Sequence, residues 1–375
     1  MPNQLIILQP INLCNLNCSY CYVPGRRDPA KMSEDILEAS IKHVFNSPKT
    51  VYDDTLTFLW HAGEPLAAGI EYYQKSVNYI KKYNTDNRRI NFAIQTNATL
   101  INQAWCDFFK KHHFDVGISV DGPKFIHDNQ RRDWLNHGSF DRVMKGVELL
   151  KTNGIELASI SVITDYTLDH VEEFYQFFKE NKFVRLAINI DENESIHTTS
   201  SFNNLSPELI NRYKNFMSKL YDLWIQDHRS IKIREFEDML SFIVFKKSSD
   251  ENVIAMDATA FSIITISKTG DINTFSPEMA GGTAANSKEF IIGNVLEINS
   301  FDDLIENPNF RKQLTSIGKG INNCANVCEY FELCGGGSPT NKYYETGSFE
   351  ATETMHCKLT KQALTDVVLD KISVC

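Results

Sequence analysis

The sequence predicts an α/β fold in which the first half of the chain forms a partial barrel of six parallel strands. Three observations predict it. Short apolar runs alternate with helical patterns from residue 5 to about residue 189, polar motifs follow several of these runs, and a cysteine cluster follows the first one. Parallel strands need long crossovers, which the intervening helices supply. In such barrels, residues that do chemistry gather at the carboxyl ends of the strands.

The strands and helices of this half are expected in alternation. Short apolar runs predict the strands, and apolar residues at helical spacing predict the helices. The expected strands are residues 5–9, 55–60, 91–95, 115–120, 156–163 and 185–189. The expected helices are residues 33–45, 71–83, 103–113, 140–151 and 168–179. Six such units make an open barrel rather than a closed one.

The second half follows a different pattern. A helix over residues 206–228 is expected to bridge the halves. A hairpin of residues 262–267 and 272–275 follows, and an amphipathic helix over residues 359–372 comes last. Because 375 residues favour two domains, we predict them over residues 1–230 and 231–375.

Composition and charge disfavour several classes of protein. The net charge of -10 is spread along the chain, which disfavours a nucleic-acid partner held by phosphate contacts. No run approaches the ~18 apolar residues that span a membrane, and the first residues carry no secretory pattern. Most of the nine cysteines are clustered, which fits metal ligation in a reducing compartment better than disulfides. We therefore expect a cytoplasmic protein without a nucleic-acid or membrane partner.

The first cysteine cluster is the most informative local feature. Cys14, Cys18 and Cys21 place three thiols within eight residues. Three thiolates can hold three irons of a four-iron cluster and leave the fourth iron open to a ligand. A structural zinc site would normally use four protein ligands, and a zinc knuckle or an incidental cluster is the alternative.

The spacing C-x3-C-x2-C, with Tyr20 before the last cysteine, resembles that of the radical S-adenosylmethionine (radical SAM) enzymes. The resemblance implies a partial (β/α)6 TIM barrel with a [4Fe-4S] cluster. The open iron of that cluster binds the amino and carboxylate groups of S-adenosylmethionine. It also implies an external electron donor such as flavodoxin or ferredoxin.

Polar motifs after the strands resemble the cofactor contacts of that family. His61-Ala62-Gly63-Glu64-Pro65 resembles its Gly-Gly-Glu-Pro motif, in which the carboxylate accepts from the methionine ammonium. Other strand ends are expected to contact the ribose and the carboxylate of the cofactor. The two tyrosines beside Cys21 are expected to contact the cluster and the adenine. Each motif alone also fits a turn or a helix start. The expected contacts are Tyr20, Tyr22, Gly63, Glu64, Asn97, Ser119, Asp121 and Arg131.

A second cysteine set resembles the C-terminal SPASM extension of peptide maturases, which usually carries two auxiliary clusters. This chain has Phe275 and Ser338 where two of those cysteines fall, and no cysteine between Cys106 and Cys324. We therefore predict one auxiliary [4Fe-4S] cluster, and zinc is the alternative because four thiolates suit it equally. The predicted ligands are Cys324, Cys328, Cys334 and Cys357.

The segment around Gly335–Gly337, with Phe-Ser-Pro-Glu at 275–278, resembles the GrrM/OscB group of radical maturases and their cyclophane-forming relatives. That resemblance implies a short ribosomally made precursor peptide as substrate. A 5′-deoxyadenosyl radical would start the joining of an aromatic ring carbon to a β-carbon. Ser276 stands where sulfatase maturases carry an aspartate proposed as base. Glu278 is the nearby carboxylate, either a catalytic base or a solvated loop residue.

Other outcomes fit the same framework. The chain could form a thioether, invert a stereocentre or oxidise a side chain as sulfatase maturases do. A metal-binding scaffold without turnover is the alternative from a different class of protein.

Overall fold

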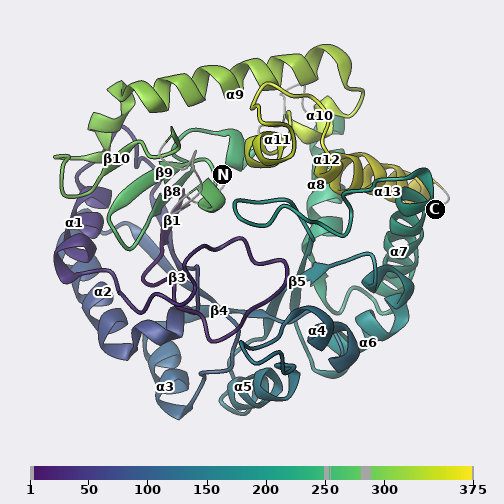
Figure 1. Cartoon of the computed structure of the whole chain (residues 1–375), viewed down its shortest axis with the longest axis horizontal. Coiled ribbons are helices and arrows are strands. Elements are labelled where there is room, and N and C mark those ends of the chain that lie inside the picture. The colour runs from purple at the N-terminus through teal and green to yellow at the C-terminus, as the bar shows by residue number, and fades with distance from the viewer. Residues whose placement is uncertain (1–3, 249–252, 254, 280–288, 374–375) are drawn as a thin grey trace.

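The computed structural model describes residues 4–248, 253, 255–279 and 289–373. The strands form the inside of a ring, and the helices form its outer layer (Figure 1). The segment that follows the first strand crosses the middle of this ring (Figure 1). The chain after residue 300 lies along one side of the ring, with α9 outermost.

The predicted strands of the first half are confirmed, with ends that differ by at most two residues. They are β1 (Gln4–Leu8), β2 (Thr55–Trp60), β3 (Arg89–Thr96), β4 (Phe114–Ser119), β5 (Ala158–Ile163) and β6 (Arg185–Ile190). Each pairs in parallel with the next, so their carboxyl ends open on the same side. The predicted α/β partial barrel is therefore confirmed.

The helices of the first half pack outside the strands. They are α1 (Glu34–Phe45), α2 (Ile70–Tyr83), α3 (Gln103–His112), α4 (Lys124–Gln130), α5 (Phe140–Thr152) and α6 (Val171–Glu180). The predicted start of the last one, at residue 168, is wrong because residues Thr167–Asp169 form a separate 3-10 turn. Helix α1 begins where the Ser33 side chain accepts from the Ile36 amide, as N-cap serines do.

The sheet continues past the first half. In the described residues its order is β10-β9-β8-β1-β2-β3-β4-β5-β6-β7. The predicted hairpin is confirmed as β8 (Ile263–Ile266) and β9 (Asp271–Thr274), and β8 pairs in parallel with β1. Short strands β7 (Lys232–Ile233) and β10 (Gly293–Asn294) form the two edges. The domain boundary at residue 230 stays a prediction.

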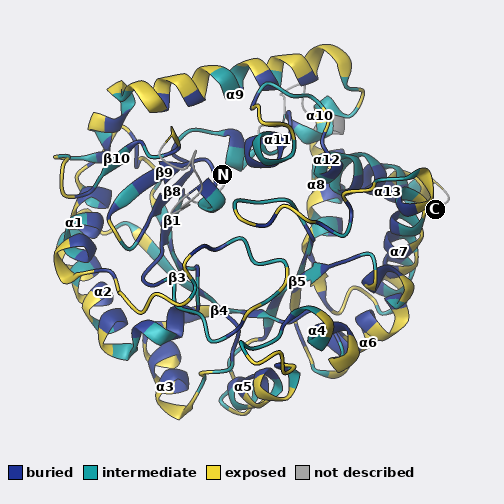
Figure 2. Cartoon of the chain, in the orientation of Figure 1, coloured by how far each residue is buried: buried dark blue, intermediate teal, exposed yellow. Residues whose placement is uncertain are grey.

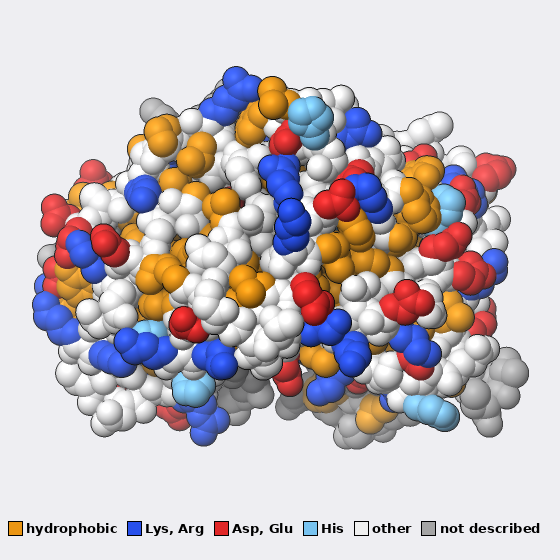
Figure 3. Space-filling model, turned by 90° about the horizontal axis from the view of Figure 1, so that it is seen from below, with side chains coloured by type: hydrophobic (Ala, Val, Ile, Leu, Met, Phe, Trp, Pro, Cys, Tyr) orange, Lys and Arg blue, Asp and Glu red, His pale blue; other side chains and the backbone are white. Residues whose placement is uncertain are grey.

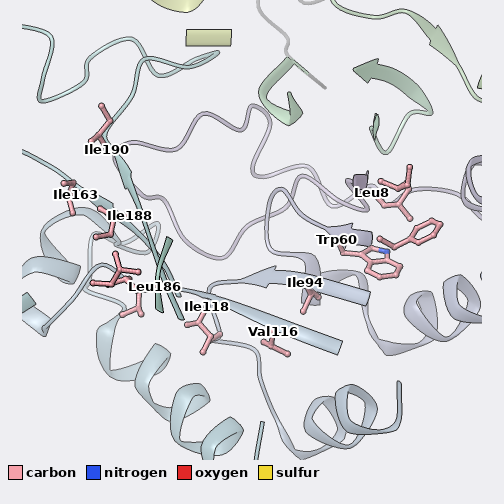
Figure 4. Close-up of a cluster of buried hydrophobic side chains, with 14 of the residues drawn as sticks. Leu8, Trp60, Ile94, Val116, Ile118, Ile163, Leu186, Ile188 and Ile190 are labelled. Atoms are coloured by element: carbon pink, nitrogen blue, oxygen red, sulfur yellow. The ribbon is translucent and has the colours of Figure 1, made fainter. Parts of the chain in front are cut away.

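The core lies between the sheet and the outer helices. Along β2, β5 and β6, alternate residues are fully buried, and the residues between them are only partly buried. Side chains of the buried set, labelled in Figure 4, are at most 4% exposed. Figure 2 shows the same division, with buried strands and exposed outer helix faces. The partly buried set therefore faces the inside of the barrel, where it leaves room for a cofactor.

Helices of the second half close the ring. They are α7 (Pro207–Gln226), α8 (Arg234–Ser248), α9 (Pro308–Val327), α10 (Phe331–Cys334), α11 (Pro339–Thr346), α12 (Met355–Cys357) and α13 (Leu364–Ser373). The predicted C-terminal helix is confirmed, but its first part, Lys358–Ala363, is π-helical.

The surface mixes charges of both signs. On the face in Figure 3, basic and acidic side chains are interspersed with apolar ones. No helix among the described residues is long and apolar enough to cross a bilayer.

Candidate active site

The first three cysteines lie on the loop that follows β1, which crosses the mouth of the barrel. All three are partly exposed, and none forms a disulfide. Backbone and side-chain N–H groups surround Cys14, whose Sγ lies 3.4 Å from the Leu16 amide and 3.8 Å from Asn97 Nδ2. Burial raises the pKa of Cys18 to about 11, so the thiol is protonated at pH 7 when no cation is bound to it.

The chain after α4 fixes this loop from the other side. The Asn17 and Ser19 amides donate to the carbonyls of Arg132 and Gln130, at 2.6 and 3.1 Å. The Trp134 indole donates to the Cys14 carbonyl at 2.9 Å. The loop is therefore held on both sides before any cofactor binds.

A buried ion pair connects the cysteine loop to the end of β4. The carboxylate of Asp121 accepts from Arg131 Nε and Nη2 at 2.9 and 3.0 Å, and from the Tyr20 hydroxyl at 2.5 Å. The Val162 amide donates to it at 2.9 Å. Asp121 is fully buried, and Arg131 is 7% exposed. Tyr20, Asp121 and Arg131, three of the predicted cofactor contacts, thus contact one another. These contacts fix the position of Tyr20, which lies between two cysteines in the sequence.

Glu64 connects the ends of β2 and β3. Its Oε1 accepts from Thr96 Oγ1 and the Leu66 amide, at 2.7 and 3.0 Å, and its Oε2 accepts from the Asn97 amide at 2.8 Å. The side chain of Asn97 donates to Asn15 Oδ1 at 2.9 Å, which brings β3 to the cysteine loop. Burial raises the pKa of Glu64. Both of its oxygens therefore accept from the protein itself, and its contact with a methionine ammonium stays a prediction.

Ser119 and Tyr22 have separate partners. Ser119 accepts from Gln95 Nε2 at 2.9 Å at the end of β4. The Tyr22 hydroxyl lies 2.8 Å from His61 Nε2. Burial lowers the pKa of His61 to about 4, so the ring is neutral at pH 7.

Gly63 lies where no side chain fits. Its φ is +59°, and an added Cβ would stand 2.6 Å from the Ile11 carbonyl oxygen and 2.7 Å from that of Asn12. Ala62, which replaces the first glycine of the family motif, also has a positive φ of 76°. The motif thus brings two backbones together beside the cysteine loop.

We expect Gly63→Ala to lower the free energy of unfolding by about 3 kcal/mol, because strain and backbone overlap add. Gly154→Ala is the matched control, since Gly154 has a similar φ of +71° and nothing within 4 Å of an added Cβ. That control should cost about 1 kcal/mol. Denaturant unfolding of the metal-free proteins measures both. Equal losses would mean that close approach of the Ile11–Asn12 backbone is unimportant.

The second cysteine set surrounds one pocket. Cys324, Cys328, Cys334 and Cys357 all line it, together with backbone of Gly336 and Gly337. All four lie at or next to helix ends, since Cys324 is in the last turn of α9, Cys328 follows it, Cys334 ends α10 and Cys357 ends α12. The Cys324 and Cys357 sulfurs lie near N–H donors, at 3.2 Å from Lys342 Nζ and 3.2 Å from the Thr354 amide.

Phe275 and Ser338, which stand where the SPASM pattern has two cysteines, have other structural roles. Phe275 is fully buried and stacks with Phe310 at 6.4 Å between ring centroids. Ser338 is the N-cap of α11. An aromatic core contact and a helix start therefore occupy the two positions where the SPASM pattern has thiols.

A cavity of about 510 Å³ adjoins the second pocket. Its lining runs from Ile188 and Asn189 on β6, past Glu192, to Cys334 and His356. Cys334 lines both spaces. The cavity therefore joins a carboxyl end of the barrel sheet to the second cysteine set.

Three carboxylates near this cavity interact electrostatically. Burial, together with the charges of Glu192 and Asp257, raises the pKa of Glu278 to about 8. Burial raises the pKa of Glu192 to about 7, and that of Glu194 well above its usual range. The charge of Cys21 adds to the shift of Glu194, which places this carboxylate towards the first cysteine set.

Sequence reasoning found one of these three carboxylates. Glu192 and Glu194 directly follow β6, so the rule that polar residues gather after barrel strands would have identified them too. Trp134, which holds the cysteine loop, carries no such signal. Cys375 lies outside the described residues. Cys106 is fully buried in α3.

The donor chemistry of both sets fits iron–sulfur clusters. Three thiols on one loop suit a cluster with one open iron, and four thiols around one pocket suit a closed one. Across the described ranges, no three His, Cys, Asp or Glu side chains are arranged to hold a single metal ion.

Several known proteins are similar to this chain in sequence. The family model described as the radical SAM superfamily matches residues 8–178. An uncharacterized protein of Synechocystis sp. is 36% identical over 372 residues, which cover 98% of this chain and 92% of that protein. A cysteine-type anaerobic sulfatase-maturating enzyme of Clostridium novyi is 35% identical over 245 residues, 62% of this chain and 63% of that enzyme.

Solved structures share the fold. Native anSMEcpe with bound AdoMet and a peptide superposes with a TM-score of 0.83 at 24% identity, covering 100% of this chain and 99% of that one. Streptococcus suis SuiB bound to its precursor peptide SuiA gives a TM-score of 0.64 at 16% identity, covering 94% of this chain and 76% of SuiB.

The chain belongs to the radical SAM superfamily. It is an enzyme of radical oxidative modification that uses a [4Fe-4S] cluster and S-adenosylmethionine. The roles of its individual site residues remain predictions.

Proposed function

We propose that this enzyme joins an aromatic ring carbon to a β-carbon within a ribosomally made precursor peptide, forming a cyclophane. One observation carries the proposal. The cavity of about 510 Å³ extends from the carboxyl end of β6 to Cys334 of the second cysteine set. A peptide side chain there would lie between the site of radical generation and a site that can accept an electron.

The first site would act as follows. Cys14, Cys18 and Cys21 would hold a four-iron cluster, which with S-adenosylmethionine supplies a 5′-deoxyadenosyl radical. The Asp121–Arg131 pair fixes Tyr20 and with it the loop between two ligands. Glu64 and Asn97 fix the opposite end of the loop through Asn15. Water would have to be excluded from the site while a reactive intermediate is present.

The proposed cross-link requires the peptide to lose two hydrogen atoms. The 5′-deoxyadenosyl radical would take one from the β-carbon and become 5′-deoxyadenosine, and the carbon radical would then form the new bond to the ring. The ring becomes aromatic again when it loses a proton and one electron. A cluster held by Cys324, Cys328, Cys334 and Cys357 would supply the acceptor for that electron. A carboxylate beside the cavity would take the proton.

Similar proteins support a peptide substrate. anSMEcpe has been solved with a bound peptide, and SuiB with its precursor peptide SuiA. We propose a short precursor peptide for this chain as well. A flavodoxin or ferredoxin would reduce the first cluster.

Glu278 is the proposed base, and its pKa of about 8 gives a pH test. The carboxyl holds its proton at pH 7 and releases it as the pH rises past about 8. Cross-linked peptide formed per 5′-deoxyadenosine should therefore rise between pH 7 and 9. Glu278→Gln should remove this rise, whereas Glu306→Gln, at an exposed ion pair, should keep it. A rise that survives in Glu278→Gln would point instead to Glu192 or Glu194.

Sulfatase-type oxidation is the second candidate, because several similar proteins are anaerobic sulfatase-maturating enzymes. It would convert a cysteine or serine side chain to an aldehyde. Ser276, in place of the aspartate of those enzymes, argues against it. A thioether, an epimerised residue and a scaffold without turnover are further alternatives.

The deciding experiment is co-expression with a short peptide encoded beside the gene, followed by mass spectrometry. Loss of two hydrogens with a new carbon–carbon link in the fragment spectra supports the proposal. An aldehyde would favour the sulfatase-type reaction, and a sulfur–carbon link a thioether. Deuterium uptake from solvent without another mass change would indicate epimerisation. Failure to cleave S-adenosylmethionine under reducing, anaerobic conditions would indicate a scaffold.

A further inference from the structure

Lys342 is a buried lysine at the second cysteine pocket. It lies on α11 and is 4% exposed. Figure 1 places α11 on the inner side of α9, next to α10 and α12. These neighbouring elements carry the four cysteines, so the Lys342 side chain points into the group of thiols.

The ammonium group of Lys342 donates to two acceptors. Lys342 Nζ lies 3.2 Å from the Sγ of Cys324 and 3.1 Å from the Gly320 carbonyl oxygen. Cys324 is itself buried, at 5% exposure. Both acceptors lie on α9, one turn apart, so the lysine is held at a fixed position relative to the sulfur.

No carboxylate balances this charge. Within the described part of the chain, Lys342 forms no ion pair with an aspartate or glutamate, unlike Lys319 on α9, which pairs with Glu350. Removing an unpaired ammonium from water is strongly unfavourable. A neutral carbonyl offsets only part of that cost, so a nearby anion must offset the rest. Four thiolates around a metal centre provide that anion, because they leave a closed [4Fe-4S] centre with net negative charge.

We propose that Lys342 is a positioning residue that raises the reduction potential of the auxiliary cluster through its charged hydrogen bond to Cys324. Reduction adds one electron to a centre that is already negative, and the fixed ammonium stabilises the reduced form more than the oxidised form. Charged hydrogen bonds and low local polarity tune such clusters strongly. This inference rests on the proposed auxiliary cluster.

The consequence concerns the last step of the proposed reaction. The ring must pass one electron to the cluster, and a higher potential makes that transfer more favourable. Lys361 lines the same pocket, and its charge favours the Cys334 thiolate, but its side chain is only partly buried and donates no hydrogen bond to the sulfur of a described cysteine. Solvent should screen its charge more strongly. It therefore serves as the matched control for a change of charge alone.

The test is an anaerobic redox titration of the auxiliary cluster, followed by electron paramagnetic resonance. Lys342→Met should lower the equilibrium constant for one-electron reduction about tenfold, which is about 59 mV. Lys342→Gln, which keeps an N–H donor without the charge, should fall between Lys342→Met and the wild type. Lys361→Met should change the constant less than twofold. Equal titrations of Lys342→Met and wild type would overturn the inference.

Metal analysis separates this outcome from failure of the proposed function. Wild type with iron at the first site only, or with zinc at the second, would disprove the auxiliary cluster itself. If Lys342→Met does not retain both clusters, the titration is carried out on Lys342→Gln. An exchangeable deuteron coupled to the reduced auxiliary cluster of wild type in D2O, and lost in Lys342→Met, would assign the hydrogen bond. A coupling that remains unchanged in Lys342→Met would contradict it.

Discussion

Asp121→Asn is expected to lower the free energy of unfolding by about 3–5 kcal/mol, because it leaves the buried Arg131 guanidinium without its anion. The carboxylate also accepts from the Tyr20 hydroxyl and the Val162 amide. The asparagine side chain has only one acceptor oxygen, and its NH2 group would face the N–H and O–H donors that now surround the carboxylate. Since Tyr20 lies between Cys18 and Cys21, the cysteine loop should also lose its fixed position.

Two measurements check this expectation. Denaturant unfolding of the metal-free protein gives the loss of stability, and iron content after reconstitution gives the loss of the first cluster. Asp115→Asn is the matched control, because Asp115 and Arg185 form an ion pair on the surface and are 63% and 44% exposed. Exposed pairs contribute about 0–1 kcal/mol. If the Asp121 variant unfolds like the control and binds iron normally, the ion pair does not stabilise the cysteine loop.

The strands were predictable because the barrel imposes a simple pattern on them. Each lies between helices and the barrel interior, so apolar runs such as the one in β2 stand out from their polar flanks. The continuation of the sheet through β8 was not predictable, since nothing local in the hairpin indicates that Ile263 pairs with Leu5. Pairing over such a separation depends on the tertiary fold, which local patterns do not encode.

The candidate site was likewise predictable only in part. Cysteine spacing marked both thiol sets, because metal chemistry restricts which residues can serve as ligands. The partners of Asp121 and Glu64 were not predictable, since both carboxylates accept from protein groups far apart in sequence. Lys342 was missed for a related reason. Its sequence neighbours suggest an ordinary polar helix, and its burial against Cys324 depends on how α11 packs on α9.

Cys357→Ala should separate the two halves of the proposed reaction. The variant loses one of the four thiols around the second pocket, so it should retain the first cluster and about half of the iron. It should still cleave S-adenosylmethionine, because Cys14, Cys18 and Cys21 lie on the separate loop after β1. Cross-linked peptide should fall at least tenfold, since the ring then lacks its electron acceptor. Iron analysis, 5′-deoxyadenosine and peptide mass measure the three quantities.

Cys106→Ala is the matched control, because Cys106 is equally a free cysteine but lies buried in α3 away from both sets. Cys106→Ala should keep its full iron content and should still form the cross-linked peptide. If Cys357→Ala loses zinc instead of iron, the second site is structural. A variant that loses its second cluster but still forms the cross-link would show that the electron leaves by another route. Either result would refute the proposed role of the second cysteine set while leaving the first intact, because the two sets lie on different elements of the fold.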